Sequence, residues 1–321
     1  MNCLCCGKPL RIETENGWHK SCIRRFFGTD KIPQIDISES KLKELASEAV
    51  NDGFTVPGVQ KKLSLHLFSQ KDGARLTLVD FPTGYILKPQ VREFESLPEA
   101  EHLVMCMAQQ CSISTVPHAL IYERENFAYI TKRVDRIFEN GSVKMLAMED
   151  FCQLDQRLTQ DKYRGSYERC AKIIDRYSCR SKLDMAEFFK RIVFSFVVGN
   201  SDMHLKNFSL IETSENSREY VLSPAYDLLP VNVIMPEDKE ELALALNGKK
   251  QNLRRNDFLI FAENCGISRS SAEKMISTIV AKRDKFFNMV SLSFISAEQK
   301  ELLRELINTR CSVFEKCGGS K

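Results

Sequence analysis

Long apolar runs, a large charge imbalance and internal repeats are all missing from this sequence of 321 residues. No stretch approaches the roughly 20 apolar residues of a membrane-spanning helix, and the N-terminus MNCLCCGKPL has no apolar signal core. We therefore expect a cytoplasmic protein with no membrane segment. The 46 basic and 43 acidic residues give a net charge of +3, which neither requires nor excludes a nucleic-acid partner. The length fits about two domains of roughly 150 residues.

Cysteine, in contrast, is abundant, with twelve residues. Without a secretion signal, reduced thiols and metal ligands are expected rather than disulfides. Cysteines that stand alone in the sequence are expected to be small core residues, because free cysteine is readily buried. This group comprises Cys106, Cys111, Cys152, Cys170, Cys179 and Cys265.

The first 22 residues hold two close pairs of metal-ligand residues. Cys3 and Cys6 form C-x-x-C, and His19 and Cys22 form H-x-x-C. Two such pairs separated by about a dozen residues are typical of a tetrahedral structural Zn²⁺ site. So short a segment has little core of its own, so a metal would stabilise it. The alternative is a set of unrelated thiols and a surface histidine.

Strand patterns dominate the first part of the chain and helix patterns the second. A short amphipathic helix is expected at 42–50, strands within 62–80, at 83–90 and at 128–137, and a helix at 96–111. From about residue 146 the pattern is mostly helical. This order predicts an α+β fold rather than alternating α/β. The predicted domains are a zinc-knuckle-like segment at 1–32, a strand-rich lobe at 33–137 and a helical lobe at 138–321.

The stretch GNSDMHLKNFSLIE, residues 199–212, crowds polar side chains behind a long apolar helix pattern. The helix is expected to stop at Gly199, which places Asp202 and Asn207 on a loop held by a buried helix. A predicted hairpin follows and leads to Asp227. An Asp-x-x-x-x-Asn loop, a hairpin and a second aspartate are parts that kinases use for phosphoryl transfer.

In that interpretation Asp202 accepts the proton of the attacking hydroxyl, and Asn207 and Asp227 hold Mg²⁺ through oxygen atoms. His204 and Lys206 would help to neutralise phosphate charge. The alternative is a helix-capping aspartate, a turn asparagine and an unrelated acid.

A kinase also needs a loop over the phosphates and a lysine on a nearby strand. The stretch FTVPGVQKK, residues 54–62, contains one glycine and is a weak phosphate-loop pattern by itself. Lys88 ends the predicted strand YILK, where a phosphate-binding lysine is expected, and Glu101 on the following helix is a possible partner. The alternative for both is a solvated surface position.

These motifs resemble those of the HipA-like serine/threonine kinases, the toxins of bacterial toxin–antitoxin systems. The matching stretches include TVPGVQKK, YILKP, EAEHLVM, KRVDR, KYRGSYE, FSFVVGNSDMHLKNFSLI and LSPAYDLLP, in the family's order. The resemblance implies a two-lobed kinase-like fold that binds ATP and Mg²⁺, with Asp202 as catalytic base and Asn207 and Asp227 as metal ligands. It also implies nucleotide contacts by Val56, Gly58, Lys62, Lys88, Lys132, Val134, His204 and Lys206.

The same resemblance implies regulation and partners. Thr55 stands where the family has an autophosphorylated residue that switches the kinase off. The implied substrate is a protein, with an aminoacyl-tRNA synthetase as the best candidate. Only about thirty residues precede the kinase pattern, as in the short HipT-type kinases. A small HipS-like protein and a HipB-like helix-turn-helix antitoxin are therefore expected partners, and DNA is expected only through the antitoxin.

Two other functions remain open at the level of sequence. The Asp-x-x-x-x-Asn loop also serves small-molecule and lipid kinases. A non-catalytic DNA-binding regulator could use the zinc knuckle and a basic run that contains Lys249, Lys250, Arg254 and Arg255. The regulator gives no reason for the set of Asp202, Asn207 and Asp227.

Overall fold

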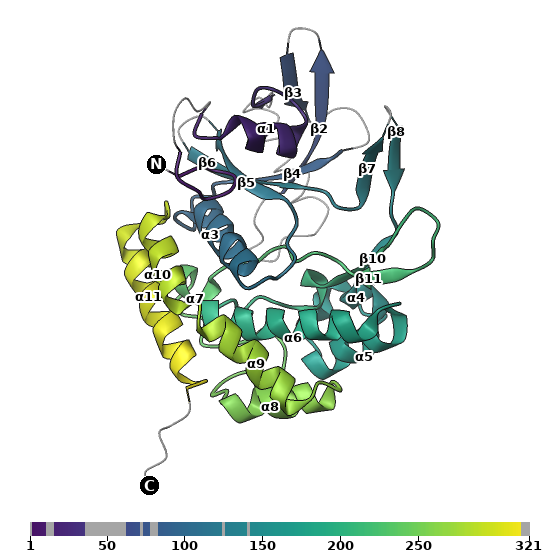
Figure 1. Ribbon diagram of the computed structural model, residues 1–321, viewed down its shortest axis with the longest axis vertical. Coiled ribbons are helices and arrows are strands. Elements are labelled where there is room, and N and C mark those ends of the chain that lie inside the picture. Colours follow the sequence, from purple (N-terminus) through teal and green to yellow (C-terminus); the bar gives the residue numbers. More distant parts are fainter. Residues whose placement is uncertain are drawn as a thin grey trace. The chain divides into compact units, whose positions relative to one another are not determined.

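The computed structural model describes residues 2–10, 16–35, 62–70, 73–77, 83–123, 126–139 and 142–315. The helix expected at 42–50 and the loop residues Thr55, Val56 and Gly58 lie outside these ranges. Two compact units are formed, one by Met1–His102 with Val116–Arg133 and the other by Leu103–Thr115 with Val134–Lys321. The first, the β-rich unit, is built on a sheet, and the second, the helical unit, is mostly α-helix, which confirms the predicted α+β class (Figure 1).

A six-stranded sheet forms the β-rich unit, in the order β1-β3-β2-β4-β6-β5. Its strands are β1 (Gln34–Ile35), β2 (Leu63–Gln70), β3 (Gly73–Thr77), β4 (Tyr85–Pro89), β5 (His118–Glu123) and β6 (Asn126–Lys132). Neighbouring strands are antiparallel except β1 and β3. Strand β5 escaped the sequence pattern because its residues 118–121 are all buried, which removes the alternation that marks a half-exposed strand.

The N-terminal segment packs on this sheet through aromatic side chains. Trp18, Phe26 and Phe27, at the start and on the face of α1 (Lys20–Phe27), form ring contacts with one another. Phe26 and Phe27 also contact Tyr85 of β4. The indole N–H of Trp18 donates to the carbonyl of Leu120 on β5, at 3.0 Å. The segment therefore has a small aromatic core that it shares with the sheet.

Helix α3 (Leu97–Gln110) confirms the helix expected at 96–111, and the chain passes along it from the β-rich unit into the helical unit. The strand expected at 128–137 is wrong in its extent. Strand β6 ends at Lys132 and β7 (Arg136–Glu139) pairs with β8 (Ser142–Met145), not with the six-stranded sheet. The sequence pattern of a strand continues between β6 and β7, but the chain leaves the β-rich unit between Arg133 and Val134 and enters the helical unit.

The helical unit contains a three-stranded sheet in the order β11-β10-β9 and a set of helices around α6. The strands are β9 (Met148–Asp150), β10 (Ser209–Glu212) and β11 (Tyr220–Leu222). The helices are α4 (Phe151–Leu154), η1 (Thr159–Asp161), α5 (Tyr167–Tyr177), α6 (Ser181–Val198), η2 (Leu205–Asn207), α7 (Val231–Ile234), α8 (Arg255–Asn264), α9 (Arg269–Val280), α10 (Arg283–Leu292) and α11 (Ala297–Ser312). Among the described residues, no helix is both long and apolar enough to cross a membrane.

Helix α6 is the central element of this unit, and α5, α9 and α11 pack against it (Figure 1). It ends as expected at Gly199, whose φ of 70° lies in the left-handed region that favours glycine. A Cβ atom at this position would overlap the side chain of Leu306 on α11. Glycine is therefore required at the start of the following loop both by conformation and by the close approach of α11.

Candidate functional site

The loop that follows α6 brings Asp202 and Asn207 together. The backbone carbonyl of Asp202 accepts hydrogen bonds from the N–H of His204 and from Nδ2 of Asn207, each at 2.8 Å. The Asp202 N–H donates to Oδ1 of Asn200 at 3.3 Å. Asn207 is buried, whereas the Asp202 side chain is 41% exposed. The five-residue spacing seen in the sequence thus joins the Asn207 amide to the backbone of a residue whose carboxylate is accessible.

The β10–β11 hairpin returns the chain to this loop and delivers Asp227. Tyr226 makes the connection, because its hydroxyl lies 2.5 Å from Oγ of Ser209 and donates to the carbonyl of Lys206 at 3.1 Å. Asp227 itself has a φ of 56°. A left-handed conformation is uncommon for a residue other than glycine and is often found at functional sites.

The donor set of this loop fits a magnesium ion. Mg²⁺ prefers oxygen ligands, and the Asp227 carboxylate and the Asn207 amide supply them. The Asn207 amide nitrogen is already used in the bond to Asp202, so its oxygen is the atom available to a cation. The structure therefore joins Asp202 and Asn207 within the loop and brings Tyr226, the neighbour of Asp227, to the same loop.

His204 and Lys206 differ in their charge. Burial lowers the pKa of His204 to about 4, although the nearby Asp202 charge acts in the opposite direction. Neutral imidazole can donate a hydrogen bond to a phosphate but adds no positive charge. Lys206 Nζ forms an ion pair with Oδ2 of Asp150 at 2.6 Å. Asp150 also caps α4, so the position of Lys206 is tied to a helix end.

Two further residues reach the loop, and the sequence reasoning missed both. Asp150 is the partner of Lys206, and Tyr163 donates from its hydroxyl to Oδ1 of Asp202 at 2.5 Å. Tyr163 lies 39 residues before Asp202, and no spacing rule connects positions so far apart. Its sequence signal is limited to the stretch KYRGSYE, which contributed only to the family resemblance.

In the β-rich unit, Lys88 and Glu101 form a buried ion pair. Lys88 Nζ lies 2.6 Å from Oε1 of Glu101, and the side chains are 3% and 0% exposed. The ammonium group also lies 5.2 Å from the ring centre of Tyr129, which pairs with Lys88 across β4 and β6. The possible partner suggested by the sequence is therefore the partner in the structure. A strand lysine paired with a helix glutamate is one of the parts that protein kinases use to hold nucleotide phosphates.

The remaining predicted nucleotide contacts are placed as follows. Lys62 is exposed and comes directly before β2. Lys132 ends β6, and burial lowers its pKa. The chain passes from the β-rich unit to the helical unit between Arg133 and Val134. The boundary between the units therefore lies between Lys132 and Val134, two residues to which the resemblance assigns nucleotide contacts.

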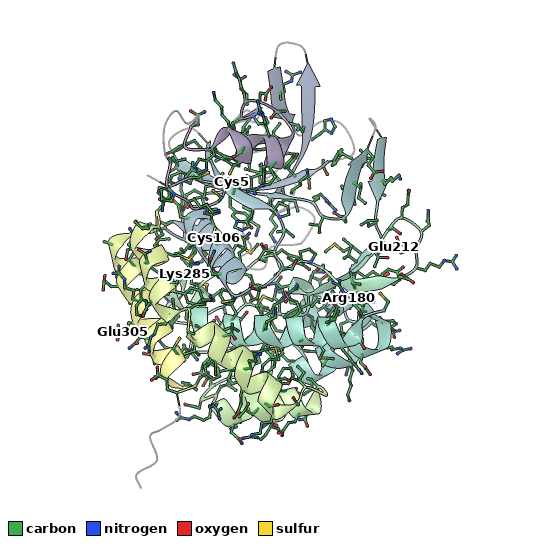
Figure 2. All side chains as sticks on the ribbon, in the orientation of Figure 1. Cys5, Cys106, Arg180, Glu212, Lys285 and Glu305 are labelled. Atoms are coloured by element: carbon green, nitrogen blue, oxygen red, sulfur yellow. The ribbon has the colours of Figure 1, made fainter. Side chains whose placement is uncertain are left out.

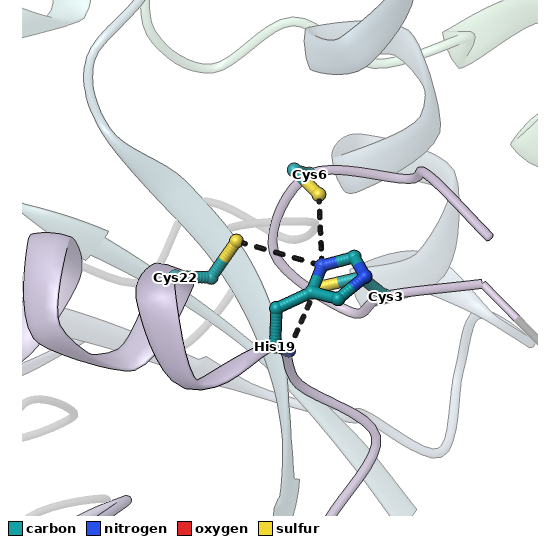
Figure 3. Close-up of side chains that lie close together, drawn as sticks. All are labelled: Cys3, Cys6, His19 and Cys22. Carbon is teal, nitrogen blue, oxygen red and sulfur yellow. Dashed lines mark hydrogen bonds between the residues drawn. The ribbon is translucent and has the colours of Figure 1, made fainter. Parts of the chain in front are cut away.

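The predicted zinc ligands form a cluster in the structure. The Sγ atoms of Cys3, Cys6 and Cys22 and a ring nitrogen of His19 all lie within 4.8 Å of one another. Nδ1 of His19 is 3.5 Å from the Cys6 sulfur and 3.8 Å from the Cys22 sulfur. Dashed lines in Figure 3 mark both contacts. The other ring nitrogen, Nε2, lies 3.2 Å from the carbonyl of Pro9. A second hydrogen bond of this kind orients histidine ligands of metal ions.

The environment of the thiols also fits a cation. Burial alone would raise the pKa of Cys3, but backbone N–H groups, including that of His19, donate to its sulfur and lower the pKa. Burial and the neighbouring thiols raise the pKa of Cys22. A bound divalent cation would stabilise the thiolates and so lower the pKa values of the three neighbouring cysteines. Cys5, labelled in Figure 2, is buried beside the cluster but does not belong to it, and burial raises its pKa to about 11.

The basic run near residue 250 is largely paired with acidic residues. Lys249 lies 2.8 Å from Asp257, and Lys250 lies 3.1 Å from Glu240. Arg255 pairs with Glu273 at 2.7 Å. Such pairing reduces the charge available to a nucleic-acid backbone and so does not favour the DNA-binding alternative.

The chain is similar to a known protein family and to individual proteins of other organisms. The family model described as "HipA-like C-terminal domain" matches residues 54–286. A Haemophilus influenzae protein named "Putative kinase" is 27% identical over 274 residues, which cover 76% of this chain and 76% of the relative. "Putative kinase Y4dM" of Sinorhizobium fredii is 32% identical over 232 residues, 67% of this chain and 54% of the relative. The chain thus spans about half the length of the Sinorhizobium protein.

Solved structures share the fold. A chain of the Shewanella oneidensis complex of HipA, HipB and operator DNA matches with a TM-score of 0.69 at 18% identity, covering 84% of this chain and 70% of that one. The Helicobacter pylori proinflammatory kinase CtkA matches with a TM-score of 0.52 at 18% identity, covering 71% and 86%. The family match extends over the loop of Asp202 and the ion pair of Lys88, and the chain belongs to the family of the HipA-like C-terminal domain.

Proposed function

We propose that this protein is an ATP-dependent serine/threonine protein kinase that acts as the toxin of a toxin–antitoxin system. The observation that carries the proposal is that the loop after α6 holds Asp202 and Asn207 together, while the β10–β11 hairpin returns the chain to this loop just before Asp227. Asp202 would accept the proton of the substrate hydroxyl, and Asn207 and Asp227 would hold Mg²⁺. Lys88, fixed by Glu101, would bind the ATP phosphates.

The chemistry in this proposal is positioning and charge stabilisation. When bound, MgATP supplies the phosphoryl group and the counter-charge that its transfer needs. The partly exposed Asp202 carboxylate is accessible to a serine or threonine hydroxyl. Neutral His204 and the anchored Lys206 would orient the phosphates by hydrogen bonding.

The test is phosphate transfer from labelled ATP to the proteins of a heat-treated bacterial lysate. The wild-type protein should label protein, and Asp202→Ala and Asp227→Ala should lose the label by orders of magnitude while keeping their melting temperature. Wild-type rates in both variants would contradict the kinase mechanism. Label only in lipid or small-molecule fractions would support the alternative of a lipid or small-molecule kinase.

The substrate and partners form the finer part of the proposal. The Shewanella oneidensis structure contains HipB and operator DNA with HipA, which supports a HipB-like antitoxin here, with DNA bound through that partner; the small HipS-like protein rests on the sequence resemblance. We propose an aminoacyl-tRNA synthetase as the substrate and Thr55 as an autophosphorylation site. Phosphoproteomics after induced expression, with Asp202→Ala as control, should find both phosphosites. A target set without any synthetase would remove that part of the proposal.

We also propose that Cys3, Cys6, His19 and Cys22 bind one structural Zn²⁺. The compact cluster supports this proposal, as does the second hydrogen bond of His19. Metal analysis of the purified protein should find one zinc per chain, and Cys3→Ser should lose it. A metal-free protein with a fully folded N-terminal segment would contradict the site.

A further inference from the structure

Tyr163 touches the carboxylate that the proposed reaction uses as its base. Its hydroxyl donates to Oδ1 of Asp202 at 2.5 Å. We propose that Tyr163 is a positioning residue: it holds Oδ1 of Asp202 so that Oδ2 is the oxygen that meets the hydroxyl of the protein substrate. This inference rests on the proposed kinase function and adds a residue to it.

The carboxylate of Asp202 depends on this contact for its orientation. The bonds from His204 and Asn207 reach the backbone carbonyl of Asp202 and leave the side chain unrestrained. Within the residues that the structure describes, the hydrogen bond from Tyr163 is the one that its carboxylate receives. Nε2 of His204 is 4.0 Å from Oδ1, which is beyond hydrogen-bond distance. An aspartate that is 41% exposed would otherwise sample several rotamers.

Tyr163 is 42% exposed, but its backbone segment and one part of its ring are held by neighbours. It lies between η1 and α5, and the carbonyl of its neighbour Lys162 accepts the N–H of Leu205 at 3.1 Å, which joins this segment to the loop of Asp202. Its ring and the buried ring of His204 form a T-shaped contact, with centroids 4.9 Å apart and an angle of 78°. Lys162 Nζ lies 5.0 Å from the ring centre. The phenol is therefore directed to Asp202 by a held backbone and by its ring contact with His204.

The protonation state of Tyr163 agrees with a donor role. Burial, and then the charge and hydrogen bond of Asp202, raise the pKa of Tyr163 above its ordinary value. The hydroxyl stays protonated at neutral pH, so it donates and does not compete with Asp202 for the substrate proton. Oδ2 makes no hydrogen bond within the described part of the chain, and it is the oxygen left for the substrate.

The experiment compares Tyr163→Phe with wild type in the transfer of labelled phosphate from ATP to heat-treated lysate proteins. Phenylalanine keeps the ring against His204 and removes the hydroxyl alone. The maximal rate should fall by about tenfold to a hundredfold, the range expected for a lost hydrogen bond to a charged group, while the half-saturating ATP concentration stays within about twofold. Tyr177→Phe is the matched control, because Tyr177 is an exposed tyrosine of the same unit whose hydroxyl makes no hydrogen bond within the described residues, and it should keep the wild-type rate.

The outcomes separate the two proposals. Absence of Asp202-dependent transfer in the wild-type protein would overturn the kinase function itself. If wild type is active and Asp202→Ala is not, an unchanged rate in Tyr163→Phe overturns the positioning role. A higher rate would show that Tyr163 obstructs the base, and a loss confined to ATP affinity would show that it acts on the nucleotide; either result also overturns the inference.

Discussion

Removing one partner of the buried Lys88–Glu101 pair should destabilise the protein, whereas removing both should not. The two side chains are 3% and 0% exposed and their charged atoms are 2.6 Å apart. In Lys88→Met the Glu101 carboxylate would lose its ion-pair partner in the interior, which costs about 3–5 kcal/mol. In the double variant Lys88→Met/Glu101→Leu both charges of the pair are removed, and replacements of this kind are often neutral or stabilising by about 1–4 kcal/mol.

Urea unfolding followed by circular dichroism would measure these differences, with phosphate transfer assayed on the same preparations. We expect the single variant to be less stable and inactive, and the double variant to regain stability but remain inactive, because Lys88 is then absent from the nucleotide site. A fully active double variant would refute the role of Lys88 in binding ATP. A single variant as stable as wild type would refute the view that the pair is buried and mutually dependent.

Trp18 is the single tryptophan of the chain and is fully buried beside the cysteine cluster. Removal of zinc with a chelator should therefore shift its fluorescence to longer wavelength. An unchanged spectrum after zinc loss would show that the metal does not stabilise the N-terminal segment. Burial lowers the pKa of His102 to about 4 from 6.5; the unfolded state therefore binds the extra proton first, and the free energy of unfolding should fall between about pH 6.5 and pH 4, by about 3 kcal/mol from this residue. Denaturant titrations at several pH values give the free energy of unfolding, which should fall less steeply with decreasing pH in His102→Gln than in wild type. An equal dependence on pH in the two proteins would contradict the buried neutral state of His102. Gly199→Ala should lower the free energy of unfolding by about 2–5 kcal/mol, because alanine is strained in the left-handed conformation and its Cβ overlaps Leu306. Thermal melts of Gly199→Ala/Leu306→Ala should recover part of the lost stability, and no recovery would assign the whole loss to the backbone conformation.

The features that the sequence predicted well depend on local spacing. Strand β4, helix α6 and the β10–β11 hairpin follow from hydrophobic periodicity and from stop signals such as Gly199. The cysteine cluster follows from two short ligand motifs. In each case the pattern that predicts the feature is local: a periodicity along one element, a stop residue, or ligands three positions apart.

The features that it missed depend on contacts between distant positions. The bond from Tyr163 to Asp202 and the ion pair of Asp150 with Lys206 join residues 39 and 56 positions apart. Strand β5 is buried on both faces, which erases its alternation. Strands β6 and β7 are separate because β6 pairs with β4 and β7 pairs with β8. The apolar pattern of a strand does not tell which strand it pairs with. Periodicity records burial along one element and contains no information about its partners.

The close approach of Leu306 to Gly199 has a consequence for the order of events during synthesis. The ribosome adds the loop of Asp202 about a hundred residues before α11, yet Gly199, the first residue of the loop, packs closely against Leu306 of that helix. The carbonyl of Gly199 also accepts the N–H of Asn232, which is likewise made later. We therefore expect a nascent chain that ends before Ala297 to have a less ordered loop than the chain of 321 residues. The loop of Asp202 would then reach its full order only after α11 has been made.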